Sequence, residues 1–419
     1  MANLESTEEA RTAGGQVATA DLIIGIPAST DAEELRQRAG RSVGDLIAAA
    51  PSLKVIVAYP GNSTGDAIDF LNQDSETGLR FLEYTPQQGA PASAPWLGLS
   101  SACSTLRDIA EKAGAHACVV LGADLTTFNV ESLRVLAQPV LDQRAELVMP
   151  IYPASKYEGL LNSAILYPMT RALFGRKVRF PVASDFGASI RMLGRIAQQP
   201  GRGGPPGNTE SVVWAATEAA VTDSSLVQAY LGARHVAQND GLDLSTVLGH
   251  LVGSLFADVD KYAAFWQRVR GAQPTSTLGS PGAPVNDGEA ADIRPMLESF
   301  NLGSRNLQEV WSLVLTPVTL LDVRRLSRVT PESFRIPDAL WVRIMYDFAL
   351  AYRLRTISRA HLLGALTPLY LGWVASYVQE IAAANSYTAE QRIEQLAKAF
   401  EEGKPYLVSR WRWPDRFNP

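Results

Sequence analysis

Two side chains with the donor atoms that divalent cations accept follow short apolar segments of the chain. Asp124 comes soon after the apolar residues 119–121, and His235 ends the predicted strand 226–235. Mg²⁺ and Mn²⁺ need few protein ligands when the oxygens of a diphosphate complete their coordination. Together, Asp124 and His235 therefore predict a cation that holds a diphosphate. Taken singly, each has a structural alternative, because aspartate also caps helices and a lone histidine is more often structural.

Positive charge is concentrated in one stretch of 24 residues. The side chains are those of Lys156, Arg171, Arg176, Lys177 and Arg179. Charge-assisted hydrogen bonds from such a group can neutralise an acidic substrate or a leaving diphosphate. The alternative is a basic face that is exposed to solvent.

Two further carboxylates lie beside predicted loops. Asp185 lies between an apolar segment and Gly187, where it accepts hydrogen bonds from sugar hydroxyls or closes a turn. Glu210 follows the Gly- and Pro-rich residues 201–208 and opens a predicted helix over 210–221. There its negative charge either stabilises the helix N-terminus by interacting with the helix dipole, or it joins a site when the loop closes. The motifs of dinucleotide binding, P-loop phosphoryl transfer, zinc proteolysis and serine hydrolysis are absent from the sequence.

Short apolar runs alternate with helical segments in the first part of the chain. Strands are predicted at 21–26, 53–58, 80–84, 117–121 and 146–151, and helices at 31–50, 65–72 and 97–113. This alternation predicts an α/β fold with a parallel sheet that helices cover on both faces. Ligands bind beyond the carboxyl ends of the strands in such sheets, so residues 27–30, 60–64 and 122–127 are expected around one crevice.

Composition and spacing divide the chain into four parts. They are a flexible polar tail over residues 1–20, an α/β domain over 21–260, a flexible linker over 271–291, and a mainly helical region over 292–419. Aromatic residues of the last part either form a dimer surface or pack in a core: Trp341, Tyr346, Trp373 and Tyr377.

The overall composition excludes several classes of protein. Lys and Arg total 38 against 43 Asp and Glu, a net charge of −5 that argues against a nucleic-acid binder. Cys103 and Cys118 are too few for a disulfide scaffold, which fits a reducing cytoplasm. The N-terminus lacks the features of a secretory signal, and no run reaches the roughly 18 apolar residues of a membrane span. We therefore expect a cytoplasmic protein that does not bind membranes.

The order of these segments resembles the retaining GT-A glycosyltransferases that make glucosylglycerate, mannosylglycerate and glucosyl-3-phosphoglycerate. The likeness runs from about residue 21 to 412, is closest to the glucosylglycerate synthase type, and is most specific over 167–179 (YPMTRALFGRKVR). Further matching stretches are 23–27 (IIGIP), 61–66 (GNSTGD), 123–125 (ADL), 156–159 (KYEG), 181–187 (PVASDFG), 231–235 (LGARH), 251–256 (LVGSLF), 366–371 (LTPLYL) and 404–412 (KPYLVSRWR).

The resemblance implies a GT-A fold with a helical C-terminal extension, and a homodimer. The implied activity moves a hexose, with retention, from a nucleoside diphosphate sugar to a small acidic acceptor such as D-glycerate. It implies a divalent cation, Mg²⁺ or Mn²⁺, on Asp124 and His235. The implied nucleotide-sugar site contains Pro27, Ala28, Ser63, Gly122, Ala123 and Asp124. The implied catalytic residues are Asp185, Glu210 and Lys156, and the acceptor residues are Arg179, Lys156 and Tyr157.

The sequence departs from the family pattern at these same positions. The first Asp of the D-x-D motif is Gly122, and Pro-Ile-Gly-Gly-Asp reads Pro-Val-Ala-Ser-Asp over 181–185. The Gly-Lys-Gly segment reads Gly-Ala-Pro-Ala over 89–92, and Arg-His-Lys reads Ala-Ser-Lys over 154–156. The Asn-Ser-Asp-Gly-Gly-Ser segment reads Ala-Tyr-Pro-Gly-Asn-Ser over 58–63, and Glu210 replaces an aspartate. Two functions follow as hypotheses: an active glycosyltransferase, or a catalytically impaired paralogue that acts as a partner or regulatory subunit.

Overall fold

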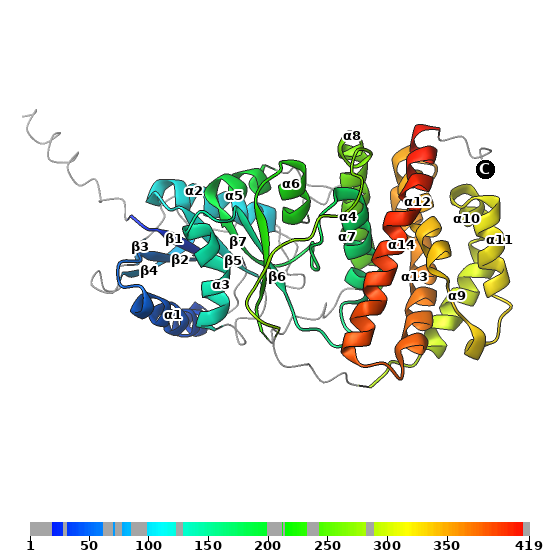
Figure 1. Cartoon of the computed structure of the whole chain (residues 1–419), viewed down its shortest axis with the longest axis horizontal. Helices are drawn as coiled ribbons and strands as arrows, with labels where there is room; N and C mark the ends of the chain where they lie inside the picture. The colour runs from blue at the N-terminus through cyan, green and yellow to red at the C-terminus, as the bar shows by residue number, and fades with distance from the viewer. Residues whose placement is uncertain are drawn as a thin grey trace, which may run out of the picture.

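The structure, a computed structural model, contains a sheet covered by helices and, beside it, a block of helices (Figure 1). It describes residues 19–27, 32–61, 70–71, 78–84, 99–122, 129–198, 212, 214–232, 243–281 and 289–413. The side chains of residues 32–36 and 70–71 are outside this description. Each part has its own hydrophobic core.

Nine strands form the sheet in the described parts of the chain, in the order β3-β4-β2-β1-β5-β7-β6-β8-β9. Seven strands share one direction, whereas β3 is antiparallel to β4, and β7 is antiparallel to both β5 and β6. The expected parallel sheet is therefore a mixed one. The strands are β1 (Leu22–Gly25), β2 (Val55–Pro60), β3 (Phe70–Leu71), β4 (Leu79–Tyr84), β5 (Ala117–Leu121), β6 (Leu147–Ile151), β7 (Asp185–Ser189), β8 (Leu226–Tyr230) and β9 (Thr277–Leu278).

Helices cover both faces of this sheet, as the alternation of segments predicts. α1 (Ala32–Ala49) and α3 (Val130–Leu141) lie on one face, and α2 (Leu99–Ala113), α5 (Ile190–Ala197) and α6 (Ala215–Val221) lie on the other (Figure 1). The central strands β1 and β5 are buried along their whole length. Continuous apolar runs such as ACVVL are typical of strands that are buried on two faces.

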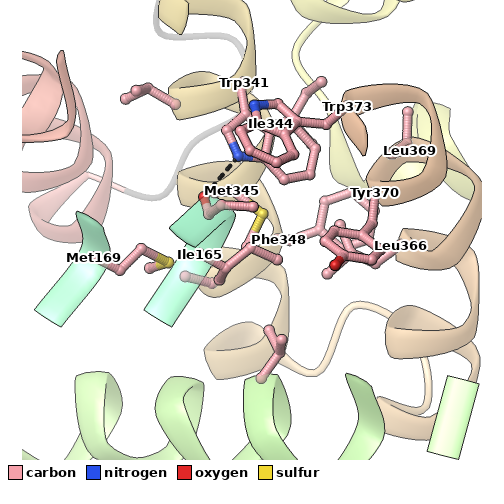
Figure 2. Close-up of a cluster of buried hydrophobic side chains, with 14 of the residues drawn as sticks. Ile165, Met169, Trp341, Ile344, Met345, Phe348, Leu366, Leu369, Tyr370 and Trp373 are labelled. Carbon is pink, nitrogen blue, oxygen red and sulfur yellow. Dashed lines mark hydrogen bonds between the residues drawn. The ribbon is translucent and has the colours of Figure 1, made fainter. Parts of the chain in front are cut away.

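The helical block is built around aromatic side chains. All four aromatic residues named above are buried, so they pack in a core and do not form a dimer surface. The Trp341 indole donates a hydrogen bond to the backbone oxygen of Ala164 over 2.9 Å, and its ring lies beside Trp373 (Figure 2). The helices are η3 (Asn162–Leu166), α4 (Tyr167–Phe174), α7 (Leu244–Lys261), α8 (Ala263–Trp266), α9 (Arg294–Asn306), α10 (Gln308–Val314), α11 (Pro317–Leu326), η4 (Pro331–Ser333), α12 (Asp338–Leu354), α13 (Arg359–Ile381) and α14 (Ser386–Arg412).

The two cores do not divide the chain at residue 260. Helices η3, α4, α7 and α8 come from the first 266 residues but pack in the helical core, against the C-terminal helices. The predicted linker 271–291 contains β9, which pairs with β8, so this part of it is an edge strand. The predicted helix 65–72 is wrong at residues 70–71, which form β3 because they pair with β4.

Within the residues that the structure describes, no helix has both the length and the apolar character needed to cross a bilayer.

Candidate functional site

Two residues predicted to bind the nucleotide sugar and one predicted catalytic residue lie at the same edge of the sheet. Pro27 follows the end of β1, and Gly122 follows the end of β5. Asp185 begins β7 directly opposite Leu121. Because β7 is antiparallel, its first residue lies at the edge where the parallel strands end. The structure therefore brings Pro27, Gly122 and Asp185 to the edge at which α/β sheets bind ligands.

Gly122 is in close contact with the segment that precedes β7. Its backbone N–H donates a hydrogen bond to the backbone oxygen of Ser184 over 3.0 Å. A Cβ atom placed on Gly122 would lie 2.9 Å from both the Cβ and the backbone oxygen of Ser184. Contacts this short require the neighbouring backbone to move, so only glycine fits here without rearrangement.

Asp185 is fully buried, and its orientation depends on a tyrosine. The hydroxyl of Tyr152 donates a hydrogen bond to Oδ2 of Asp185 over 2.9 Å. Tyr152 directly follows β6, and its ring lies edge-on to Phe180, with centroids 5.1 Å apart. Tyr152 was not predicted from the sequence. A hydroxyl-bearing side chain immediately after an apolar strand was the signal that could have found it.

Lys156 is also placed by the loop after β6, but it points to the helical block. Its ammonium donates hydrogen bonds to the backbone oxygens of Ile381, Ala382 and Ala384, over 3.4, 3.3 and 2.7 Å. These carbonyls lie at or just beyond the C-terminus of α13, where helices leave acceptors unpaired and the dipole favours a cation. The ammonium also lies 5.0 Å from the centre of the Tyr157 ring.

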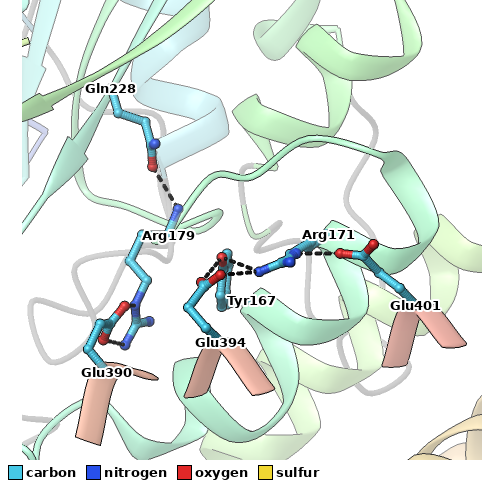
Figure 3. Close-up of polar contacts among 7 residues, drawn as sticks. All are labelled: Tyr167, Arg171, Arg179, Gln228, Glu390, Glu394 and Glu401. Atoms are coloured by element: carbon cyan, nitrogen blue, oxygen red, sulfur yellow. Dashed lines mark hydrogen bonds and ion pairs between the residues drawn. The ribbon is translucent and has the colours of Figure 1, made fainter. Parts of the chain in front are cut away.

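Arg179 contacts α14 rather than the strand ends. Its guanidinium forms a two-point ion pair with Glu390, over 2.7 and 3.1 Å (Figure 3). It also donates a hydrogen bond to Ser163 over 3.0 Å. Burial lowers the pKa of Arg179, but attraction to the Glu390 carboxylate outweighs that effect, so the pKa is raised. The guanidinium packs on Phe180, which contacts Tyr152 in turn. Two aromatic rings thus connect Arg179 to Asp185.

Arg171 is the most buried member of the predicted basic cluster. It pairs with Glu394 over 2.6 Å and with Glu401 over 2.5 Å, and its side chain is only 6% exposed (Figure 3). The hydroxyl of Tyr167 joins the same network by donating to Glu394. These acids lie on the same side of α14 as Glu390, so α14 presents a row of carboxylates to the cluster.

The basic cluster is therefore divided among several partners. Lys156, Arg171 and Arg179 contact α13 and α14, and Arg176 pairs with Asp223 over 3.0 Å. The interpretation as a solvent-exposed face fails for Arg171, because α14 covers it. In the described structure, Lys156 and Arg179 connect the sheet part of the chain to α13 and α14, whereas Arg171 on α4 pairs within the helical block.

A second lysine reaches from α14 to the end of α4. Lys404 on α14 donates hydrogen bonds to the backbone oxygens of Ala172 and Val269, over 3.0 and 2.9 Å. Ala172 belongs to the last turn of α4, so this lysine pairs with a carbonyl at a helix C-terminus. Burial of the ammonium lowers the pKa of Lys404 to about 8.

Both cysteine thiols are free and buried. Burial raises the pKa of Cys103 to about 12 and raises that of Cys118 well above its ordinary value. A nucleophilic cysteine needs a lowered pKa and access to substrate, so neither thiol has the character of a nucleophile.

Six predicted site residues lie outside the described residues: Ala28, Ser63, Ala123, Asp124, Glu210 and His235. Their roles stay predictions. Across the described ranges, no three His, Cys, Asp or Glu side chains are grouped to hold a metal ion. Position 122, where the family pattern has a carboxylate, leaves no space for one beside Ser184. The ligands that the resemblance implies for the cation, Asp124 and His235, both lie outside the described residues, so the cation stays a prediction.

No protein-family model matches this chain, and comparison with curated proteins finds no match either. The functional assignment therefore depends on the residues at this edge of the sheet.

Proposed function

We propose that this chain is a retaining GT-A glycosyltransferase. It moves a hexose from a nucleoside diphosphate sugar to a small acidic acceptor such as D-glycerate. The observation that carries the proposal is the position of Asp185, a buried carboxylate at the edge where the strands end, oriented by the Tyr152 hydroxyl. Once the residues that cover it move aside, this carboxylate can accept hydrogen bonds from sugar hydroxyls and hold the hexose in one orientation.

The sheet order supports the GT-A part of the proposal. Parallel strands β4-β2-β1-β5 form a half-sheet of the kind that binds nucleotides, and the antiparallel β7 joins it to β6 and β8. Asp185 begins the strand that joins the two groups of parallel strands, at the end of the sheet where α/β folds bind ligands.

The same edge favours a second candidate function, a catalytically impaired paralogue that acts as a partner or regulatory subunit. Position 122 is closed to a carboxylate, and Lys156 and Arg179 are engaged by α13 and α14. Loss of several polar groups from one site is expected when selection for catalysis has ended. This candidate predicts a stable protein complex and no turnover.

A transfer assay distinguishes the two candidates. The purified chain is incubated with UDP-glucose, GDP-glucose or GDP-mannose and D-glycerate, and the hexosyl product is detected by mass spectrometry. The transferase proposal predicts a product that disappears in Asp185→Asn and persists in Asp108→Asn, which changes an exposed carboxylate on α2. If the folded protein yields no product with any donor, the proposal fails and the paralogue becomes the better account.

A further inference from the structure

We infer that one end of the helical block, where the C-termini of α7, α12 and α14 meet, binds the surface of an anionic lipid bilayer. This binding goes beyond the proposed function and does not depend on it. The expectation of a chain that does not bind membranes rests on the missing signal and the missing span, and a protein needs neither to bind at a bilayer surface.

Helices α7, α12 and α14 run in the same direction, so their C-termini lie together. Near the helix starts, Arg392 of α14 pairs with Asp338 of α12 over 2.6 Å. Near the helix ends, Arg353 of α12 donates a hydrogen bond to the backbone oxygen of Trp411 on α14 over 2.8 Å. The same guanidinium lies 3.8 Å from Asp260 in the last turn of α7. Figure 1 shows α14 ending on the same side of the block as α8, which follows α7.

This end of the block, which we call the basic end, carries an excess of positive charge. It consists of residues 258–271, 351–361 and 409–413. Within these three segments Asp260 is the one acid that reaches solvent, because Asp258 is fully buried. Arginine or lysine side chains are more numerous, and five of them are exposed: Lys261, Arg268, Arg270, Arg355 and Arg412. The whole chain has a net charge of −5, so its charge is unevenly distributed.

Helix dipoles account for only part of this charge. A cation in the last turn of a helix is favourable, and Lys261, Arg353 and Arg412 hold such positions. Arg270 does not, because it lies four residues beyond the end of α8. Burial lowers the pKa of Lys404, and repulsion from Arg270 lowers it further. A cation that repels its neighbour does not stabilise the fold, so its position is better explained by an anionic partner.

Two apolar side chains of the basic end are exposed among these cations. Trp413 is 68% exposed, and Leu354 is 44% exposed. The end of α14 that presents Trp413 is anchored, because the buried ring of Trp411 packs edge-on against Trp266 with centroids 5.2 Å apart. The guanidinium of Arg353 covers the other side of that anchor, 4.4 Å from the Trp411 ring. The exposed indole is therefore held outward by a fixed helix end.

These apolar side chains favour a bilayer over a nucleic acid as the anionic partner. A nucleic acid uses cations for its phosphates and aromatic rings for stacking on its bases, and Leu354 serves neither purpose. At a bilayer, both Leu354 and Trp413 can enter the interface while the arginines contact lipid phosphates. These contacts can form together, because the segments that carry them meet at one end of the block.

The test is sedimentation of the full-length protein with lipid vesicles. One set contains phosphatidylglycerol and phosphatidylcholine in equal parts, and the other contains phosphatidylcholine alone. We expect the wild type to bind the anionic vesicles, to leave the neutral ones unbound, and to dissociate as the salt concentration rises.

Two pairs of matched variants locate the surface. Arg268→Gln/Arg270→Gln should weaken binding to the anionic vesicles at least about tenfold. Arg134→Gln/Arg144→Gln makes the same change in net charge at exposed positions on and beside α3, and should leave binding unchanged. Trp413→Ala should weaken binding several-fold, whereas Tyr387→Ala removes an exposed aromatic ring at the other end of α14 and should have no effect.

Several results would overturn the inference. They are the absence of binding to anionic vesicles, equal binding to both kinds of vesicle, and equal losses in a variant and its control. Binding of duplex DNA as tightly as of anionic vesicles would also overturn it, because charge alone would then explain the attraction. None of these results depends on hexose transfer, so the proposed function stands or fails separately.

Discussion

The hydroxyl of Tyr152 lies 2.9 Å from Oδ2 of Asp185 and joins the end of β6 to the start of β7. The main-chain register between these strands covers Leu147 with Ala188 and Val148 with Gly187. The side-chain bond therefore extends their contact to the edge of the sheet. Both side chains are buried, so the carboxylate is held in one place before any ligand arrives.

Tyr152→Phe tests this relationship with a minimal change. Removing the hydroxyl leaves a buried carboxylate with one donor fewer, which should lower the free energy of unfolding by about 1–3 kcal/mol. It should also reduce hexose transfer, because Asp185 loses its orientation. Chemical denaturation and the transfer assay provide the measurements.

Tyr346→Phe is the control, because it removes another buried hydrogen bond, from the Tyr346 hydroxyl to the backbone oxygen of Phe400. It should lower stability while leaving the rate of transfer per folded molecule unchanged. Equal loss of activity in both variants would contradict the role of Tyr152.

Arg171 is predicted to stabilise the contact between α4 and α14. Arg171→Met leaves Glu394 and Glu401 without their shared partner in a partly covered position, and should cost about 2–3 kcal/mol. Arg176→Met makes the same chemical change in an ion pair with the exposed Asp223, and should cost less than about 0.5 kcal/mol. Denaturant titration of the two variants gives the comparison. Similar costs would mean that the α14 network does not stabilise the fold.

Lys404 should make stability depend on pH in the alkaline range. Its pKa in the folded protein is about 8, against an ordinary value of 10.5. Between these values the unfolded chain holds the proton more strongly than the folded protein does. Neutral Lys404 therefore stabilises the fold fully above pH 10.5, and this stabilisation is lost as the pH falls towards 8. The free energy of unfolding changes by about 3 kcal/mol over this range.

The lysine contribution is isolated by comparing the wild type with Lys404→Met over this range. The difference in unfolding free energy between the two should move in favour of the wild type as the pH rises from 8 to 10.5. Buried tyrosines and cysteines that also titrate there are common to both proteins and cancel. A difference that does not change with pH would contradict the lowered pKa.

The two thiols should be protected in the native protein. Burial keeps both protonated, and Cys103 has a pKa of about 12, so iodoacetamide at pH 8 should modify neither while the fold is intact. Unfolding in denaturant should expose both, and intact-mass spectrometry counts the adducts. Rapid modification of the native protein would show that α2 or β5 opens readily.

The strands of the sheet were predictable where burial alone decides the sequence. β5 was expected at 117–121 and forms there, because a short continuous apolar run is typical of a strand that is buried on both faces. β3 and β9 were missed because each is a two-residue strand that exists through pairing with a neighbour. Such pairing is a tertiary effect, and a two-residue segment is too short to show any periodicity.

The site was only partly predictable for a similar reason. Asp185 could be singled out because a carboxylate between an apolar segment and a glycine is unusual. The positive charges of Arg179 and Lys156 were visible too, but what neutralises them was not. The partner of Arg179 is Glu390, 211 residues later on α14. Sequence spacing shows that charge is present, and only the packing of α13 and α14 shows where it is used.

The central claim is that the edge of the sheet beside Asp185 binds a nucleoside diphosphate sugar. Calorimetric titration of GDP and UDP into the purified protein, in EDTA and again in Mn²⁺, tests it most directly. The account predicts micromolar binding of one nucleotide that requires Mn²⁺, because Asp124 and His235 are the predicted ligands of a cation that holds the diphosphate. Failure of both nucleotides to bind at millimolar concentration to the folded protein would contradict the transferase and direct the search to a protein partner.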